Sequence, residues 1–290
     1  MGWRTIIVRT NSKLSYKLGY MLVRNIEETY IFIEEINNLI IESNQCIIST
    51  ELINQAIKNN INLIFCDEKH SPNSQLIGLN NNYNGPKNLL KQIKWNDEIK
   101  EILWQKIIIN KIINQSFLLD KYGCLEHELL DEYAKNVEKN DVTNREGHAA
   151  KVYFNSLFGK DFNRRDEENE TNHVLNYLYS LILSIFNRVL VEYGYNTQLG
   201  IWHKNEFNFF NLSCDLMEPF RIIVDDYYLK YKYTIKQKKE LQNIFNIDIK
   251  INNCNEKLEN AIKIFVKQCL NFLNEGDKNQ KIPFIEKYEL

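Results

Sequence analysis

With 290 residues, the chain is long enough to form two domains, and its composition is that of a soluble globular protein. Hydrophobic residues make up 44% and charged residues 26%, and the formal net charge of −2 excludes a globally basic nucleic-acid-binding protein. Any nucleic-acid partner must therefore bind a local basic patch. Six cysteines without a CxxC pair argue against a zinc cluster or a disulfide framework. The first residues lack the apolar run of a signal peptide and no apolar span of about 18 residues is evident, so we expect a cytoplasmic protein.

The first 80 residues have the pattern of a small β domain. Short runs rich in Ile, Val, Tyr and Thr, separated by Asn-containing turns, predict strands at Thr5–Thr10, Tyr20–Arg24, Thr29–Ile33, Leu39–Ile41 and Cys46–Ile48. A short helix at 51–59, capped by Ser49 or Thr50, leads into a buried strand at Asn62–Cys66. We therefore expect a small sheet with one helix against it, and turn positions for Asp67 and His70.

The residues that follow predict a linker and then a helical domain. NNNYNGPK at 80–87 combines consecutive asparagines with Gly85-Pro86, which favours neither helix nor strand, and we assign residues 81–95 to a linker. From residue 96 to residue 290 the apolar residues recur with helical period. The predicted helices are Asn96–Leu119, Gly123–Val137, Asn172–Tyr193 and Asn255–Asn274. The fold class is thus α+β, a small N-terminal β-rich domain in residues 1–80 followed by a larger all-α domain.

The most informative stretch is Leu199–Asp226, LGIWHKNEFNFFNLSCDLMEPFRIIVDD. It places His203 on a loop and two acids, Asp215 and Glu218, three residues apart on an expected helix, so that both carboxylates share one face. Their neighbours are apolar, and burial of two carboxylates is costly unless a positive group lies between them. A divalent cation with His203 as a further ligand meets this need. The alternative is that the acids are solvated or paired with Arg221.

A second polar cluster occurs in TNREGHAAKVYFN, residues 143–155. Thr143 and Glu146 have the spacing of a capping box, which would give Glu146 a purely structural role. The alternative is that Glu146 joins His203 and Glu218 in a metal site. Two carboxylates and one imidazole suit Mg²⁺ or Mn²⁺, whereas a non-haem iron oxygenase requires two histidines and one carboxylate.

EGHAAKVYF, LGIWH and DLMEPFRIIVD, in this order behind an N-terminal β segment, resemble the CRISPR-associated integrase. WRTIIVRTNSKLSY and LIFCDEKHSP are similar to the branch of that family that accompanies single-effector, type II systems. The resemblance covers essentially the whole chain. It implies a metal-dependent DNA endonuclease and integrase of the adaptation step, with Glu146, His203 and Glu218 as catalytic metal ligands and Asp215 as an accessory acid that contacts metal through water. Trp202 departs from the leucine that the family often has before its histidine.

The resemblance also implies the reaction and the partners. A 3′-hydroxyl at the end of a short DNA fragment attacks a phosphodiester of the CRISPR repeat, with Mg²⁺ or Mn²⁺ stabilising the developing charge. His203 is either a metal ligand or a general acid. Two homodimers, formed through the N-terminal domain, would flank a dimer of the second core adaptation protein in a heterohexamer. Further type II adaptation proteins and the effector nuclease are candidate partners. The alternatives are a catalytically silent DNA-binding scaffold and a phosphodiesterase of small nucleotides.

DNA must be held by local positive charge. The segment Tyr227–Lys239, YYLKYKYTIKQKK, interleaves tyrosines with lysines, and Arg164-Arg165 adds a second basic point. Lysines neutralise phosphates and tyrosines can stack on unpaired bases. The alternative is a solvated face flanked by core tyrosines. The candidate DNA contacts are Arg164, Arg165, Lys230, Lys232, Lys236, Lys238 and Lys239.

Overall fold

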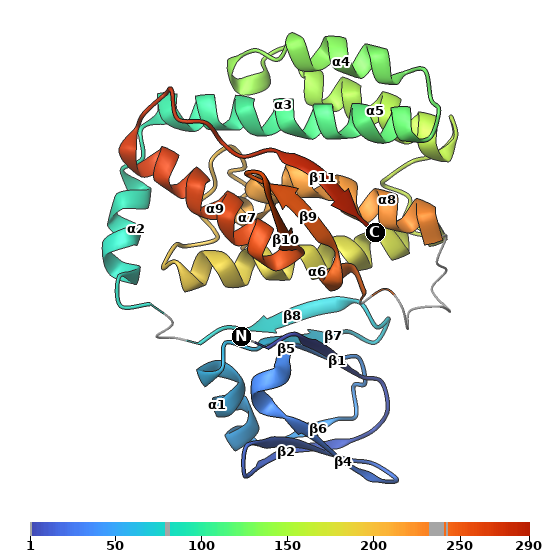
Figure 1. Ribbon diagram of the computed structural model, residues 1–290, viewed down its shortest axis with the longest axis vertical. Helices are drawn as coiled ribbons and strands as arrows, with labels where there is room; N and C mark the ends of the chain where they lie inside the picture. The colour runs from blue at the N-terminus through green and yellow to red at the C-terminus, as the bar shows by residue number, and fades with distance from the viewer. Residues whose placement is uncertain (1, 79–81, 232–240, 242) are drawn as a thin grey trace. The chain divides into compact units, whose positions relative to one another are not determined.

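The computed structural model describes residues 2–78, 82–231, 241 and 243–290. The chain divides into two compact units, Met1–Asn81 and Asn82–Leu290, which we call the N-terminal and C-terminal domains (Figure 1). Strands dominate the first domain and helices the second, so the α+β fold class and the order of its two parts are confirmed.

The N-terminal domain contains two four-stranded sheets. The first has the order β1-β5-β7-β8, in which β1, β5 and β7 run parallel and β8 is antiparallel to β7. Parallel strands that are covered on both faces have nearly continuous apolar runs, and Leu39, Ile40 and Ile41 of β5 are all buried. These strands are β1 (Arg4–Val8), β5 (Ile36–Ile41), β7 (Asn62–Cys66) and β8 (Pro72–Leu76).

The second sheet of this domain has the order β4-β3-β2-β6. Its centre is a hairpin whose two loop residues, Leu18 and Gly19, have φ of 48° and 89°, as a two-residue hairpin turn with the twist of its strands requires. The N-cap of helix α1 (Thr50–Lys58) is Ser49, whose hydroxyl accepts the N–H of Leu52 at 3.3 Å, as predicted. The strands are β2 (Lys13–Lys17), β3 (Tyr20–Arg24), β4 (Glu28–Phe32) and β6 (Ile47–Ile48), and a short 3-10 helix, η1 (Ile33–Glu35), precedes β5. β2 and β8 were not among the predicted strands.

The C-terminal domain is organised around two long helices, α3 (Asp97–Lys121) and α6 (Glu170–Glu192). Helix α3 contacts α4, α5, α8, α9 and η3, and α6 contacts α7, α8 and α9. By length and composition α6 could cross a membrane, contrary to the expectation that the chain has no such apolar span, but 72% of its most apolar stretch is buried inside the protein. Further described helices of this domain, besides α2 (Gly85–Ile93) near its start, are α4 (His127–Lys135), η2 (Lys139–Asp141), α5 (Arg145–Phe158), α7 (Asn211–Met217), η3 (Glu218–Phe220), α8 (Arg221–Tyr231) and α9 (Leu258–Glu275).

Two segments differ from the sequence prediction. Gly85-Pro86, assigned to the linker, begins helix α2 (Gly85–Ile93), because proline has a helical φ and lacks an N–H that the first turn would leave unpaired. The helix predicted from Asn255 begins at Leu258, because β10 (Cys254–Lys257) pairs with β9 (Asp248–Ile251). With β11 (Ile285–Glu289) these strands form a three-stranded antiparallel sheet, which adds a small β element to the predicted helical domain.

Candidate active site and metal centre

Glu146 lies in the first turn of α5, but it does not form the predicted capping box. Asp141 caps this helix from upstream: its Oδ1 accepts the N–H of Arg145 at 2.7 Å and its Oδ2 accepts the N–H of Glu146 at 2.9 Å. The Thr143 hydroxyl is buried and has no hydrogen-bond partner among the described residues. Because a buried aspartate replaces Thr143 as the cap, the Glu146 side chain is available for a contact outside its own helix.

The turn before α5 is shaped by three residues in the left-handed region. Asn140, Asp141 and Asn144 have φ of 61°, 47° and 51°. Asparagine and aspartate tolerate this conformation better than other residues with a side chain. The turn aims the Asp141 carboxylate at the start of α5, and so fixes the position of the Glu146 backbone.

Glu218 is buried at the junction between α7 and α8, where it opens the short helix η3. Its Oε1 accepts the Nε–H of Arg221 at 2.9 Å, and its Oε2 lies 2.6 Å from the Nζ of Lys111. Burial by itself would raise the pKa of Glu218, but the charges of Arg221 and Lys111 lower it to about 2. The pairing with Arg221 that the sequence left open is therefore present, and a second cation faces the other oxygen.

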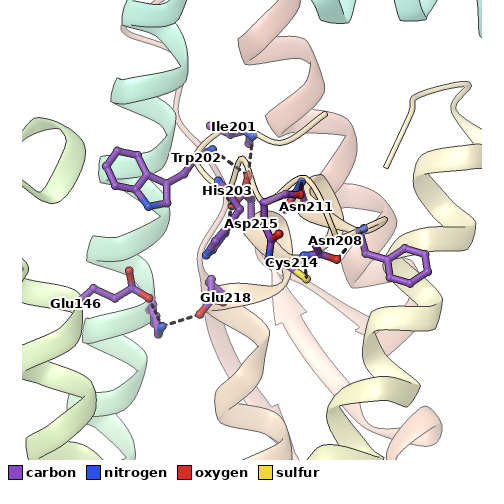
Figure 2. Close-up of polar contacts among 12 residues, drawn as sticks. Glu146, Ile201, Trp202, His203, Asn208, Asn211, Cys214, Asp215 and Glu218 are labelled. Carbon is purple, nitrogen blue, oxygen red and sulfur yellow. Dashed lines mark hydrogen bonds and ion pairs between the residues drawn. The ribbon is translucent and has the colours of Figure 1, made fainter. Parts of the chain in front are cut away.

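Lys111 joins the two glutamates. Its side chain, only 11% exposed, leaves α3 and places Nζ 2.6 Å from Glu146 Oε1 as well as 2.6 Å from Glu218 Oε2. In Figure 2, dashed lines run from Glu146 and from Glu218 to an unlabelled side-chain nitrogen, in keeping with the two ion pairs to Lys111. Burial alone would lower the pKa of Lys111, but Glu218 and Glu146 raise it, so the ammonium is charged.

The sequence analysis did not single out Lys111. The signal that could have found it is its position on the buried stripe of α3, four residues after Ile107 and seven before Leu118. Lysine at such a position is rarely buried without a partner. Asn114, one turn further along α3, donates to the Pro219 carbonyl at 2.8 Å and so anchors η3.

His203 lies on the loop between α6 and α7, and Asp215 holds both the loop and the imidazole. Asp215 Oδ2 accepts the N–H groups of Ile201 at 2.6 Å and Trp202 at 2.9 Å, and Oδ1 accepts the His203 N–H at 3.2 Å. The Nδ1–H of His203 donates to the same Oδ1, which leaves Nε2 as the ring nitrogen with a free lone pair (Figure 2). The hydrogen bond to Asp215 raises the pKa of His203, burial opposes this, and the charges of Glu218 and Glu146 add to the rise.

These contacts bear on the accessory role expected for Asp215. The side chain is fully buried, and four donors occupy its two oxygens. This arrangement favours an orienting role, in which a carboxylate fixes the tautomer and direction of a histidine, over contact with a metal through water. The two acids of the D-L-M-E motif thus have different partners, Asp215 the histidine loop and Glu218 the cations of α3 and α8.

Two neighbours of His203 explain the rest of the G-I-W-H motif. A Cβ on Gly200 would lie 2.4 Å from the His203 carbonyl oxygen and 2.8 Å from Asp215 Oδ2, so only glycine fits there. The Trp202 ring stacks on Trp104 of α3 with a centroid distance of 5.6 Å, and Trp104 meets the His203 ring edge-on at 5.7 Å. The tryptophan at this position therefore anchors the loop to α3. A cavity of about 590 Å³ borders the loop, with Trp95, Lys100, His203, Lys204 and Phe209 in its lining.

The donor set suits a hard divalent cation. Glu146 and Glu218 supply carboxylate oxygens. His203 supplies Nε2, because its other ring nitrogen, Nδ1, is hydrogen-bonded to Asp215. Two carboxylates and one imidazole fit Mg²⁺ or Mn²⁺. Glu218 Oε2 is buried and forms no aligned hydrogen bond with any described residue, although it lies within ion-pair distance of Lys111. In the described part of the chain, however, no three His, Cys, Asp or Glu side chains already form a metal-binding group. Instead, Glu146 and Glu218 both form ion pairs with the Lys111 ammonium.

Another buried acid, Asp225 on α8, connects α8 to helices α5 and α6. It accepts the Tyr153 hydroxyl of α5 at 2.7 Å and the Tyr179 hydroxyl of α6. Burial raises the pKa of Asp225, and the two tyrosine hydrogen bonds oppose the rise. Asp225 was missed by the sequence analysis, because the distant tyrosines that pair with it leave no local pattern.

The candidate DNA contacts are only partly described. The guanidinium of Arg164 donates to Asn172 at 2.7 Å and Asn176 at 2.8 Å and stacks on Phe154 and Tyr179, so it already holds α6. Arg165 is exposed, and the Nζ of exposed Lys230 donates to the Leu290 carbonyl at 2.8 Å. Lys232, Lys236, Lys238 and Lys239 lie outside the described residues.

The fold matches solved structures of low sequence identity. It matches a casposase bound to integration product with a TM-score of 0.78 and 17% identity, over 99% of this chain and 96% of that chain. It also matches a Cas1 protein from Thermotoga maritima with a TM-score of 0.74 and 15% identity, over 98% of this chain and all of that one. At these identities the likeness establishes the fold alone, a β-rich domain followed by a helical domain.

The sequence comparisons establish the family. The family described as CRISPR associated protein Cas1 matches residues 5–251. The CRISPR-associated endonuclease Cas1 of Neisseria meningitidis is 34% identical over 227 residues, which cover 78% of this chain and 74% of the relative. One from Francisella tularensis subsp. novicida is 27% identical over 259 residues, with 82% of this chain and 80% of the relative covered. The chain belongs to the Cas1 family, and the resemblance stated from its sequence motifs is confirmed.

Proposed function

We propose that this protein is a metal-dependent DNA integrase and endonuclease of CRISPR adaptation. It joins the 3′-hydroxyl of a short foreign DNA fragment to a phosphodiester of the CRISPR repeat. The observation that carries this proposal is the meeting of Glu146 and Glu218 on one buried cation, beside a histidine that a buried carboxylate orients. Relatives named endonucleases, and a fold neighbour bound to an integration product, support the same reaction class.

In this proposal Glu146, His203 Nε2 and Glu218 hold one Mg²⁺ or Mn²⁺. The bound metal would supply Lewis-acid stabilisation of negative charge on the reacting phosphodiester. Each of the three residues is held in place: Asp141 holds the Glu146 backbone, Arg221 holds the Glu218 side chain and Asp215 holds the His203 ring. Such support reduces the reorganisation that the reaction requires.

His203 has a second possible role, because its raised pKa also suits a proton donor to the leaving 3′-oxygen. We favour the ligand role, since a histidine with Nδ1–H bound to a carboxylate is the usual arrangement of a metal-ligating imidazole. The two roles separate in His203→Ala. A ligand role predicts a large loss of Mn²⁺ affinity, whereas a general-acid role predicts normal Mn²⁺ binding with slow strand transfer.

We further propose that the protein works as a homodimer with the second core adaptation protein, in a heterohexamer with DNA. The fold also matches a chain from a Cas6-RT-Cas1–Cas2 complex with a TM-score of 0.73, and this match supports the partnership. The N-terminal domain is small, and its exposed sheet edges gain from pairing across a two-fold axis. Removal of residues 1–80 should therefore give a monomer in light scattering, and a stable dimer of the truncated protein would refute the dimer assignment.

The test of the function is a strand-transfer assay with a labelled DNA fragment and a plasmid carrying the repeat. The wild-type protein should form the branched product with Mg²⁺ or Mn²⁺ and form none with EDTA. Glu146→Gln, His203→Ala and Glu218→Gln should each lose the activity, while Glu170→Gln, an exposed acid in the first turn of α6, should keep it. Unchanged activity in the three variants, with DNA bound, would instead identify a scaffold whose partner performs the chemistry.

A further inference from the structure

Lys111 occupies an unusual position for a structural lysine. Its ammonium lies between carboxylates from two separate elements, at 2.6 Å from an oxygen of each. Both oxygens belong to the residues that the proposed function assigns to a metal. Arg221 already neutralises the other oxygen of Glu218, so Lys111 supplies the positive charge that Glu146 and Glu218 share.

An ammonium at this place competes directly with a divalent cation. Mg²⁺ and Mn²⁺ bind carboxylate oxygens at about 2.0–2.2 Å, closer than a hydrogen-bonded ammonium. Lys111 and Arg221 together already balance the two carboxylates, and a divalent cation added beside both would set four positive charges against two negative ones. The shared oxygens can therefore serve Lys111 or a metal, one at a time.

The elements that carry the glutamates do not depend on Lys111 for their backbone position. Asp141 holds the first turn of α5 through the N–H of Glu146, and Asn114 holds η3 through the Pro219 carbonyl. The lysine itself reaches the site on a flexible four-carbon stem. It can withdraw without displacement of the helices that present the carboxylates.

We propose that Lys111 is a positioning residue that holds Glu146 and Glu218 together until a divalent cation takes its place, so that Lys111 and the metal exclude one another. The proposal rests on the metal site of the proposed function. It explains why the acids are close to a common point although they do not by themselves form a metal-binding group. It also makes metal affinity depend on a residue that is not a ligand.

The test is the affinity of the full-length Lys111→Met variant for Mn²⁺, measured by isothermal titration calorimetry. Methionine keeps the length of the stem and removes the competing charge. The variant should bind Mn²⁺ about tenfold more tightly or better, because the wild-type site must first release the ammonium. Its melting temperature in EDTA should fall, and the rise on Mn²⁺ addition should exceed that of the wild type. Unchanged or weaker Mn²⁺ binding would overturn the proposal.

The matched control is Lys121→Met on the same helix. Lys121 pairs with Asp226, which is buried, so this variant also loses an ion pair to a buried carboxylate. It should lower the melting temperature and leave Mn²⁺ affinity unchanged. A tighter Mn²⁺ site in both variants would show a general loosening of the domain and would overturn the specific role of Lys111.

A measurement on the wild-type protein covers the case in which Lys111→Met does not fold. An amine-reactive acetylating reagent followed by peptide mass spectrometry reports the accessibility of each lysine. Lys111 should be modified faster with saturating Mn²⁺ than with EDTA, while Lys121 keeps its rate. Equal or slower modification of Lys111 with Mn²⁺ would refute the exchange. A wild-type protein that binds no Mn²⁺ at all would refute the metal site as well.

Discussion

The Nδ1–H of His203 donates to the carboxylate of Asp215, and that carboxylate is completely buried. The same carboxylate accepts three consecutive backbone N–H groups of the loop that carries the histidine. One side chain of α7 thus determines both the path of the loop and the free nitrogen of the ring. The position of His203 therefore depends on its contacts with Asp215 more than on the sequence of the loop.

Asp215→Asn should weaken the site without direct loss of a ligand. Asparagine offers one acceptor oxygen, and its amide N–H groups oppose donors, so the imidazole loses its fixed direction. We expect a decrease of about 10- to 100-fold in Mn²⁺ affinity and in strand transfer. Calorimetry and the strand-transfer assay measure this, with Asp277→Asn as control, because the Asp277 side chain accepts the N–H of Asn279 in an exposed loop away from the site residues. Wild-type Mn²⁺ affinity in Asp215→Asn would contradict the orienting role.

Glu146 and Glu218 should act as one unit in the reaction. Each of Glu146→Gln and Glu218→Gln should slow strand transfer by at least about a hundredfold, given the charge stabilisation that is lost. The double variant should be little slower than either single variant, because the first loss already removes the metal. Rate constants under single-turnover conditions test this. Multiplication of the two effects in the double variant would show that the glutamates act independently.

Asp225 should make stability depend on pH in a defined direction. Its folded pKa lies above the ordinary 3.8, because burial raises the pKa more than Tyr179 and Tyr153 lower it. Folding therefore favours the protonated acid, and the associated stability is present below the unfolded pKa and lost as pH rises through the folded pKa. The free energy of unfolding of the wild type, minus that of Asp225→Asn, should fall as pH rises from the ordinary pKa of an aspartate through the raised folded pKa of Asp225. Urea titrations in EDTA at several pH values measure this difference, and a flat or rising difference would exclude the assignment.

The lysine-tyrosine segment remains a sequence prediction that salt dependence can test. Each lysine that contacts a phosphate contributes about 0.9 to the slope of log affinity against log salt. A triple variant should flatten this slope by roughly two to three units and weaken binding equally for all DNA sequences. It combines Lys236→Gln, Lys238→Gln and Lys239→Gln. Fluorescence anisotropy across several salt concentrations measures the slope. Glutamine at Lys13, Lys17 and Lys58, which are exposed in the N-terminal domain, provides a control of equal charge. A slope equal to that of the wild type would remove this segment from the DNA path.

The sequence by itself determined the long helices, most strands of the N-terminal domain and the candidate donors. Apolar periodicity located α3 and α6 to within a few residues, and α9 ends at Gly276, which lies in the left-handed region at φ 70°. The motifs around Glu146, His203 and Glu218 indicated the family that the sequence comparisons then established. These signals are local, since helix period, glycine positions and ligand types can be read from neighbouring residues.

Only the tertiary structure decided how these groups are partnered. Lys111 and Glu218 are far apart in the chain, and no local pattern indicates that one ammonium serves both Glu218 and Glu146. The cap of α5 passed from Thr143 to Asp141, because left-handed residues turned the aspartate toward the helix. The strand β10 replaced the first turn of the last helix, because β9 offered backbone partners that a helix end lacks. The Lys111 contacts join distant parts of the chain, whereas the Asp141 cap and the β9–β10 hairpin form between nearby residues. In each case the contact that forms satisfies a charge or a backbone group better than the predicted alternative would.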